Sequence, residues 1–167
     1  STWRVNMTEA LEAMNLLVVT VDNSPNETVY PQMADFTFYG GIYRDVNIVC
    51  VPASHFDLDY YGGPGLAVTP VMDGKDAKVA VSGYITNRKD GQNVKCLILD
   101  AEGNTVAEGE NAEGCFDFVI ENAHLWHGRK DPYLYSANLS LIENGEEIDS
   151  VSARFGCRSF EISPERG

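Results

Sequence analysis

Apolar and polar positions alternate in short runs along residues 55–157, which is the pattern of half-buried β-strands. In one such run Val79 and Val81 would share one face, whereas Lys78 would lie on the other. The alternation predicts strands at residues 56–60, 66–72, 78–86, 94–100, 105–108, 115–120, 134–142 and 148–157. The side chains predicted to face the core are Val79, Val81, Gly83, Ile85, Phe116, Phe118, Ile120, Tyr135, Ala137, Leu139, Leu141, Val151, Ala153, Phe155 and Cys157.

Turn-forming sequences separate these runs, and no convincing long helix interrupts them. The turn sequences are Gly62-Gly63-Pro64, Asp73-Gly74, Lys89-Asp90-Gly91, Glu102-Gly103-Asn104 and Asn144-Gly145. Short strands at this spacing predict an all-β fold, with two sheets packed as a β-sandwich. The runs 78–86 and 134–142 contain no cysteine, so the inter-sheet disulfide of antibody domains is not available.

The first 53 residues follow a different pattern. Strands are predicted at residues 3–7, 15–22 and 46–51, and a long irregular segment lies between the last two. Two or three strands with a long loop cannot bury a hydrophobic core of their own. We therefore predict that residues 1–53 are the end of a larger β domain and that residues 54–162 are a complete sandwich. Residues 163–167 are predicted to be the boundary to a further domain.

The predicted strands of the first region would have unpaired edges. An unpaired strand edge offers backbone N–H and C=O groups to a neighbouring chain. We therefore expect homo-oligomers to form through residues 16–21 or residues 48–51.

The charge balance narrows the classes of partner. Twelve basic against 25 acidic residues give a net charge of −13, which argues against nucleic acid or an anionic membrane surface. No apolar run approaches the roughly 20 residues of a membrane span, and no signal peptide opens the chain. The localisation stays open between the cytoplasm and the periplasm or exterior of a bacterium.

The residues that commonly bind metals do not show metal-binding spacing. The four cysteines form neither a CxxC pair nor a zinc pattern, and we expect them to be free and partly buried. They are Cys50, Cys96, Cys115 and Cys157. The acidic run at residues 108–113 lacks the spacing of a calcium loop, so a solvated loop is expected there.

Two histidines fall in the loop between the predicted strands at 115–120 and 134–142. His124 and His127 have the spacing of a helical metal site, but they lie in a loop and have no third ligand nearby. We expect instead that Leu125 and Trp126 close one end of the sandwich.

Neither catalytic nor sugar-stacking residues form a recognisable group. Asp57 and Asp59 are paired carboxylates of the kind that glycosidases use, but that chemistry needs a cleft, and the pattern places both on the solvent face of a strand. Tyr60, Tyr61 and Tyr84 would support sugar binding if they were exposed on one face, although the sequence shows no clear platform. No nucleophile, base and orienting group come together, so we predict a non-catalytic β-rich chain.

Residues 35–46 combine four aromatic residues, a double glycine and charged side chains. Gly40 and Gly41 give the backbone access to positive φ and allow another surface to approach closely. Aromatic residues on an irregular loop favour a packed contact. The segment is therefore predicted to contact a partner surface.

Three stretches resemble landmarks of the family-two glycoside hydrolases. Asp35, followed by Gly-Ile-Tyr-Arg-Asp-Val at residues 41–46, resembles the signature that closes their N-terminal sugar-binding jelly roll. Leu-Trp at 125–126 with Asp-Pro-Tyr-Leu-Tyr at 131–135 resembles a segment of their immunoglobulin-like second domain. Phe-Gly-Cys-Arg at 155–158 resembles the end of that domain, just before the catalytic (β/α)8 barrel. The amino-acid sequence around residues 35–46 is more similar to that of β-galactosidases than to that of β-glucuronidases.

The resemblance implies an immunoglobulin-like β-sandwich preceded by a few strands of a partial jelly roll. The chain would be a non-catalytic scaffold and sugar-binding portion of a retaining β-galactosidase, whose catalytic glutamates lie on a barrel that these residues do not include. Its partners would be that barrel and the remainder of the jelly roll, with a galactoside bound only in the intact enzyme. Cys157 departs from the family pattern, because it replaces an aliphatic residue that a buried cysteine can imitate.

The resemblance also assigns roles to individual residues. Asp35 would contact galactose hydroxyls in the intact enzyme, and in some members the corresponding aspartate also contacts a sodium ion. A carboxylate can accept two hydrogen bonds from sugar hydroxyls and so select an epimer. The residues with an implied structural or interface role are Gly40, Gly41, Tyr43, Arg44, Asp45 and Trp126. No cofactor is expected in this chain, whereas sodium and magnesium are expected in the full-length enzyme.

Two alternatives stay open at the level of the sequence. The first is a related enzyme of the same family that acts on β-glucuronides or β-mannosides. The second is a free-standing carbohydrate-binding or adhesion module, which a platform of exposed aromatic side chains would favour.

Overall fold

The computed structural model describes residues 4–28, 40–42, 44–160 and 162–165. The chain divides into two compact units, one formed by Arg4–Cys50 and the other by the residues from Val51 onward. The division after Cys50 falls close to the domain boundary predicted after residue 53.

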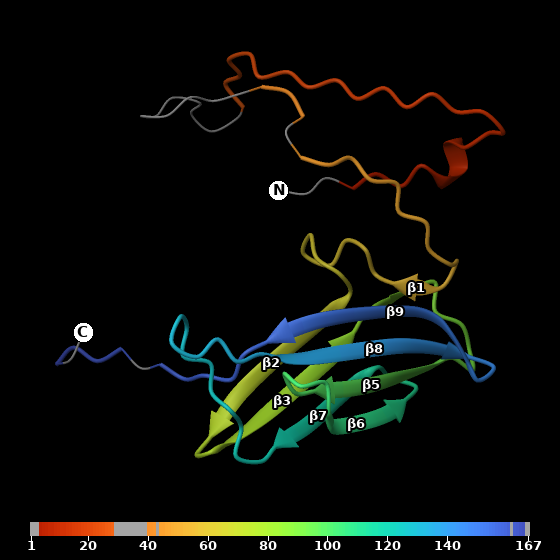
Figure 1. Ribbon diagram of the computed structural model, residues 1–167. Helices are drawn as coiled ribbons and strands as arrows, with labels where there is room; N and C mark the ends of the chain where they lie inside the picture. Colours follow the sequence, from red (N-terminus) through yellow and green to blue (C-terminus); the bar gives the residue numbers. More distant parts are fainter. Residues whose placement is uncertain (1–3, 29–39, 43, 161, 166–167) are drawn as a thin grey trace. The chain divides into compact units, whose positions relative to one another are not determined.

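The second unit is a β-sandwich, and the predicted all-β fold is confirmed. Its larger sheets have the strand orders β2-β3-β7 and β6-β5-β8-β9, while β1 pairs with β4. All strand pairs are antiparallel, and Figure 1 shows the two larger sheets stacked on each other. The strands are β1 His55–Phe56, β2 Leu66–Asp73, β3 Asp76–Gly83, β4 Ile85–Thr86, β5 Asn93–Leu99, β6 Thr105–Asn111, β7 Cys115–Ile120, β8 Tyr135–Glu143 and β9 Glu146–Phe155.

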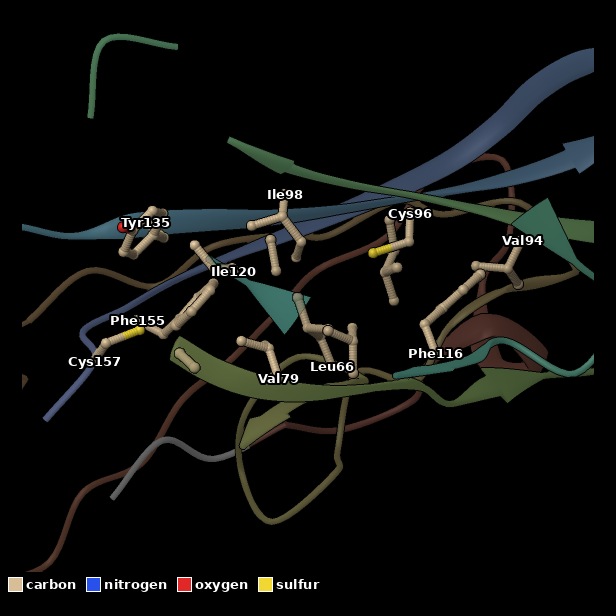
Figure 2. Packing of buried hydrophobic residues seen from close by; sticks show 14 of the residues in the cluster. Leu66, Val79, Val94, Cys96, Ile98, Phe116, Ile120, Tyr135, Phe155 and Cys157 are labelled. Carbon is tan, nitrogen blue, oxygen red and sulfur yellow. The ribbon is translucent and has the colours of Figure 1, made fainter. Parts of the chain in front are cut away.

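The hydrophobic core lies between the two larger sheets (Figure 2). Strand β8 buries every second side chain, as the alternation predicted, and the residues with no exposed surface on it are Ala137, Leu139 and Leu141. On β3 the buried residues alternate with exposed ones in the same way. Each fully buried aliphatic or aromatic side chain stabilises the fold by about 1.5–3 kcal/mol. The inward set on β9 is less completely buried, because Val151 and Ala153 are only half-buried.

The hairpin turns use residues that tolerate a left-handed backbone. Asn144 and Gly145 join β8 to β9 with φ values of 54° and 83°. Two consecutive positive φ values are the geometry of a type I′ turn, which the Asn-Gly sequence favours. The predicted turn is therefore explained by local chemistry alone.

Two predicted strands are shorter than the alternation suggested. The run 78–86 is interrupted at Tyr84, whose backbone N–H donates to the Gly65 carbonyl at 2.8 Å, so β3 and β4 are separate strands with different partners. The predicted strand at 56–60 ends at Phe56, because Asp57 Oδ1 accepts a hydrogen bond from the Asp59 N–H at 2.6 Å. A local side-chain bond of this kind favours a turn over a strand.

The first unit contains no strand among its described residues, 4–28, 40–42 and 44–50, so the strand predictions at 3–7, 15–22 and 46–51 are wrong for the positions that the structure describes. Its one regular element is a short 3₁₀ helix, Thr8–Ala10. Large apolar side chains in this unit stay exposed, including Leu16 at 90% and Val18 at 73%. A strand forms only when another strand satisfies its backbone hydrogen bonds, and residues 4–50 supply no such neighbour.

Candidate functional site

The segments 124–135 and 155–158, which are far apart in the sequence, meet at one end of the sandwich. Leu125 and Cys157 form a parallel β-bridge, and the Trp126 N–H donates to the Cys157 carbonyl at 2.9 Å. Leu125 packs against the core and Cys157 is fully buried. Leu125 thus packs at the end of the sandwich where it was predicted to lie. We call this group of contacts the exit cluster, since the chain leaves the sandwich here.

Gly156 belongs to the exit cluster because no larger residue fits at its position. A Cβ atom there would lie 2.9 Å from Trp126 Cβ and 3.3 Å from Leu134 Cδ2. These separations are shorter than ordinary carbon–carbon contacts. The glycine therefore lets the indole of Trp126 lie directly on the backbone of the departing chain.

Arg158 holds the other face of the exit cluster. Its guanidinium carbon lies 4.9 Å from the centroid of the Trp126 ring and 5.6 Å from that of Phe160. A guanidinium over an aromatic face is attracted to it by the ring quadrupole. The arginine thus connects the loop before β8, through Trp126, with the segment that follows β9, through Phe160.

A histidine–carboxylate pair stabilises the loop beside the exit cluster. His124 Nε2 lies 2.7 Å from Asp131 Oδ2, and its ring stacks on Tyr133 with the centroids 3.9 Å apart. The backbone N–H of His124 donates to the Tyr135 hydroxyl at 2.9 Å, and the His127 N–H donates to the Asp131 carbonyl at 2.7 Å. The loop is therefore built by local hydrogen bonds around Asp131.

The two histidines are not brought together as metal ligands. His124 is engaged with Asp131, and no group of three or more His, Cys, Asp or Glu side chains within the described ranges has a metal-binding arrangement. Burial raises the pKa of the Cys157 thiol and raises that of Cys96 to about 12. Both thiols are consequently protonated at neutral pH and act as small apolar side chains.

Two of the residues with a predicted role in the 35–46 segment show special backbone geometry. Gly41 has a φ of 92°, and a Cβ atom on Gly40 would lie 2.7 Å from the Asn23 side chain. Arg44 and Asp45 are exposed within this unit. Asp35 and Tyr43 lie outside the described residues, so their predicted roles stay predictions.

The paired carboxylates are placed differently from the prediction. Asp57 and Asp59 belong to a turn instead of a strand face, because Asp57 Oδ1 caps the Asp59 N–H. The acidic run at 108–113 is partly in strand β6, which extends to Asn111. Within the described ranges neither group adjoins a nucleophile and base arranged for catalysis.

A buried polar network is the feature that sequence reasoning missed. Ser54 and Gln92 are each 2% exposed, and the Ser54 hydroxyl donates to Gln92 Oε1 at 2.7 Å. Gln92 Nε2 in turn donates to Glu143 Oε1 at 3.0 Å. Nearby, the Phe56 N–H donates to Asp149 Oδ2 at 2.7 Å. These bonds hold the segment that enters the sandwich. No signal in the sequence indicated them, because a single glutamine in a turn forms no local pattern.

Together the two stacked antiparallel sheets and the exit cluster define a β-sandwich domain of the immunoglobulin-like type. No helix in the described part of the chain is long and apolar enough to cross a membrane.

Comparison with known proteins then gives the family. The model for "Glycosyl hydrolases family 2" matches residues 65–158, which include β2 to β9 and the exit cluster. The chain belongs to glycosyl hydrolase family 2.

The relatives are glycosidases that are named for different sugars. A β-glucuronidase of Bacteroides fragilis is 29% identical over 164 residues, and a β-galactosidase large subunit of Lactobacillus helveticus is 28% identical over 159 residues. These matches cover 92% and 91% of this chain. The solved structure of an FMN-binding β-glucuronidase from Faecalibacterium prausnitzii L2-6 matches with a TM-score of 0.81 and 38% identity over 87% of this chain.

The chain is much shorter than these relatives. It spans 24% of each of the two glycosidases and 23% of the solved structure. It therefore corresponds to a non-catalytic part of a family-two enzyme.

Proposed function

We propose that this chain is the scaffold and sugar-binding portion of a retaining β-galactosidase. The observation that carries the proposal is that one continuous match places the chain inside much longer glycosidases, while its own folded unit is a β-sandwich. The sandwich would hold the jelly roll and the catalytic barrel of the parent enzyme in a fixed relation. The isolated chain is expected to leave nitrophenyl β-galactoside unhydrolysed.

Two fastening points of the sandwich support the scaffold role. The segment entering it is held by the bonds of Ser54 to Gln92, and the segment leaving it is held by Trp126 and Arg158. Rigid connections at both ends transmit the position of one domain to another. A flexible tether would need neither.

Asp35 is the proposed contact with substrate in the intact enzyme. Its carboxylate would accept hydrogen bonds from galactose hydroxyls and bind a sodium ion, whereas magnesium would be held elsewhere in the parent. The loop would complete a pocket on the barrel, and residues 40–46 would contact that domain.

The test uses the full-length parent enzyme with Asp35→Ala. Loss of two charge-assisted hydrogen bonds, each worth about 1.5–3 kcal/mol, should lower kcat/KM for nitrophenyl β-galactoside by about 100-fold or more. The matched control is Asp22→Asn, an exposed carboxylate in the same unit that accepts local hydrogen bonds from the backbone and side chain of Ser24. An unchanged kcat/KM in the Asp35 variant would remove this residue from the site.

A β-glucuronidase is the second candidate. It is favoured by the match of 38% identity and TM-score 0.81 to a β-glucuronidase from Faecalibacterium prausnitzii. The parent enzyme assayed side by side on nitrophenyl β-galactoside, β-glucuronide and β-mannoside distinguishes the specificities. The highest kcat/KM on the galactoside supports the first proposal, and the highest value on the glucuronide replaces it with the second.

A further inference from the structure

The fold gathers three tyrosines from two separate segments on the surface of the sandwich. Tyr60 and Tyr84 stack with their ring centroids 4.0 Å apart and an interplanar angle of 16°. Their hydroxyl oxygens lie 3.1 Å apart, in hydrogen-bond contact. The ring of Tyr61 meets that of Tyr60 edge-on, with the centroids 4.9 Å apart. We call Tyr60, Tyr61 and Tyr84 the tyrosine platform.

The backbone beneath the tyrosine platform is firmly connected. The Asp57 N–H donates to the Tyr84 carbonyl, and the Tyr84 N–H donates to the Gly65 carbonyl, both at 2.8 Å. A Cβ atom on Gly65 would lie 2.5 Å from the Tyr84 carbonyl oxygen, so only glycine allows this approach. These backbone bonds hold the platform in place, while Tyr60 and Tyr84 each use one ring face for the contact between them.

Tyr61 is the exposed member of the platform. Its side chain is 94% exposed, and its φ of 46° is a conformation that non-glycine residues rarely adopt. A large aromatic ring in water forgoes the free energy of burial, and the left-handed backbone adds a cost. The positive φ belongs to a turn that the Gly63 N–H closes by donating to the Tyr60 carbonyl at 2.8 Å. The edge-on contact with Tyr60 still leaves most of the Tyr61 ring exposed, so the ring is free to contact a ligand.

The surroundings of the platform indicate the chemistry of that ligand. Asp57 and Asp59 lie on the same loop, and residues 55–65 contain no lysine or arginine. Carboxylates accept hydrogen bonds from hydroxyls, while the net charge of −13 repels anions. A pyranose ring offers a flat C–H face for a tyrosine and hydroxyls around its edge for the carboxylates.

We infer that the tyrosine platform is a binding site for a neutral oligosaccharide. The inference rests on the sandwich unit alone, so it does not depend on the activity of the parent enzyme. A surface site of this kind would keep an oligosaccharide substrate on the protein after the cleavage of one bond.

The test titrates the 167-residue chain, labelled with ¹⁵N, with β-1,4-galactotetraose and follows the amide shifts of residues 57–65 and 84. Saturable shifts are expected there, and Tyr61→Asn should weaken binding by about tenfold, the loss of roughly 1.4 kcal/mol of ring contact. Asparagine tolerates positive φ, so this variant retains the loop conformation. Phe160→Ala is the matched control, because it removes another exposed ring, one 75% exposed, and leaves the platform intact.

Three outcomes would overturn the inference. The first is the absence of saturable shifts, and the second is equal binding by Tyr61→Asn. The third is equal binding of a glucuronate-containing tetrasaccharide, which would contradict the neutral class.

A second experiment uses the parent enzyme. There, protection of Tyr61 from nitration without sugar would show that the platform is a contact between domains, and would also overturn the inference. Protection only when galactotetraose is added supports the inference.

Discussion

At the scale of single residues, the exit cluster depends on the absence of a side chain at Gly156. Trp126 packs against the backbone of Gly156, and the Arg158 guanidinium lies over its ring. A side chain at position 156 would displace the indole from both contacts. The Phe-Gly-Cys-Arg sequence is thus explained by packing around one tryptophan.

We predict that Gly156→Ala destabilises the sandwich by about 1–3 kcal/mol, the usual cost of overpacking. The measurement is urea unfolding followed by tryptophan fluorescence at pH 7. Gly63→Ala is the control, because its added Cβ would meet the Tyr60 carbonyl oxygen at an ordinary 3.5 Å. Equal midpoints for the two variants would contradict the packing argument.

At the scale of elements, the turn between β5 and β6 is organised by one carboxylate. Asp100 Oδ1 accepts hydrogen bonds from the backbone N–H groups of Glu102 at 3.0 Å and Asn104 at 2.7 Å. Its Oδ2 accepts a bond from the Asn104 side-chain amide at 2.9 Å. The Asn104 side chain and then these backbone donors hold the pKa of Asp100 below its ordinary value of 3.8.

The lowered pKa makes the contribution of this turn depend on pH. A carboxyl group whose folded pKa is depressed stabilises the fold above its unfolded pKa and loses that contribution as the pH falls through the folded value. We predict that Asp100→Asn is less stable than the wild type at pH 7, and that the difference shrinks as the pH falls below 3.8. Urea midpoints at pH 7 and pH 3 measure both. Asp117→Asn, which removes an exposed carboxylate on β7, is the control for the loss of one negative charge.

At the scale of the whole molecule, the two units differ in how completely they bury their apolar side chains. The sandwich encloses a continuous core, whereas the described residues of 4–50 leave Leu16, Val18 and others exposed. Exposed apolar segments with unsatisfied backbone groups pair with other chains. We therefore expect a partner to cover these side chains, which in the proposed parent enzyme would be the remainder of the jelly roll.

We predict that the 167-residue chain self-associates through this unit when that partner is missing. Replacing Leu16 and Val18 together by lysine should shift the chain toward monomer, since charged side chains prevent strand pairing. Light scattering coupled to size exclusion measures the mass across a concentration series. Ile162→Lys, at a position 78% exposed, is the control and should leave the association unchanged. A wild-type chain that is monomeric throughout would contradict the prediction.

The success of the sequence predictions depended on whether the relevant interactions were local. The turn at Asn144 and Gly145 and the buried face of β8 were predictable, because both follow from backbone preferences and a two-residue period. The end of β1 was missed because a side-chain bond of Asp57 competes with strand pairing. The role of Gln92 was missed because its partners Ser54 and Glu143 come from distant segments.

By itself, the sequence determined the sandwich strands, their inward faces and the family resemblance, because all of these follow from short-range sequence patterns. Only the tertiary structure decided that Tyr60 and Tyr84 stack, and that Arg158 lies over Trp126. It also decided that residues 15–22 form no strand, despite a composition that favours one. The physical reason is the same in each case. A strand, a stacked ring pair or a buried amide exists only when a second segment supplies its partner, and the packing of the whole chain determines which segments meet.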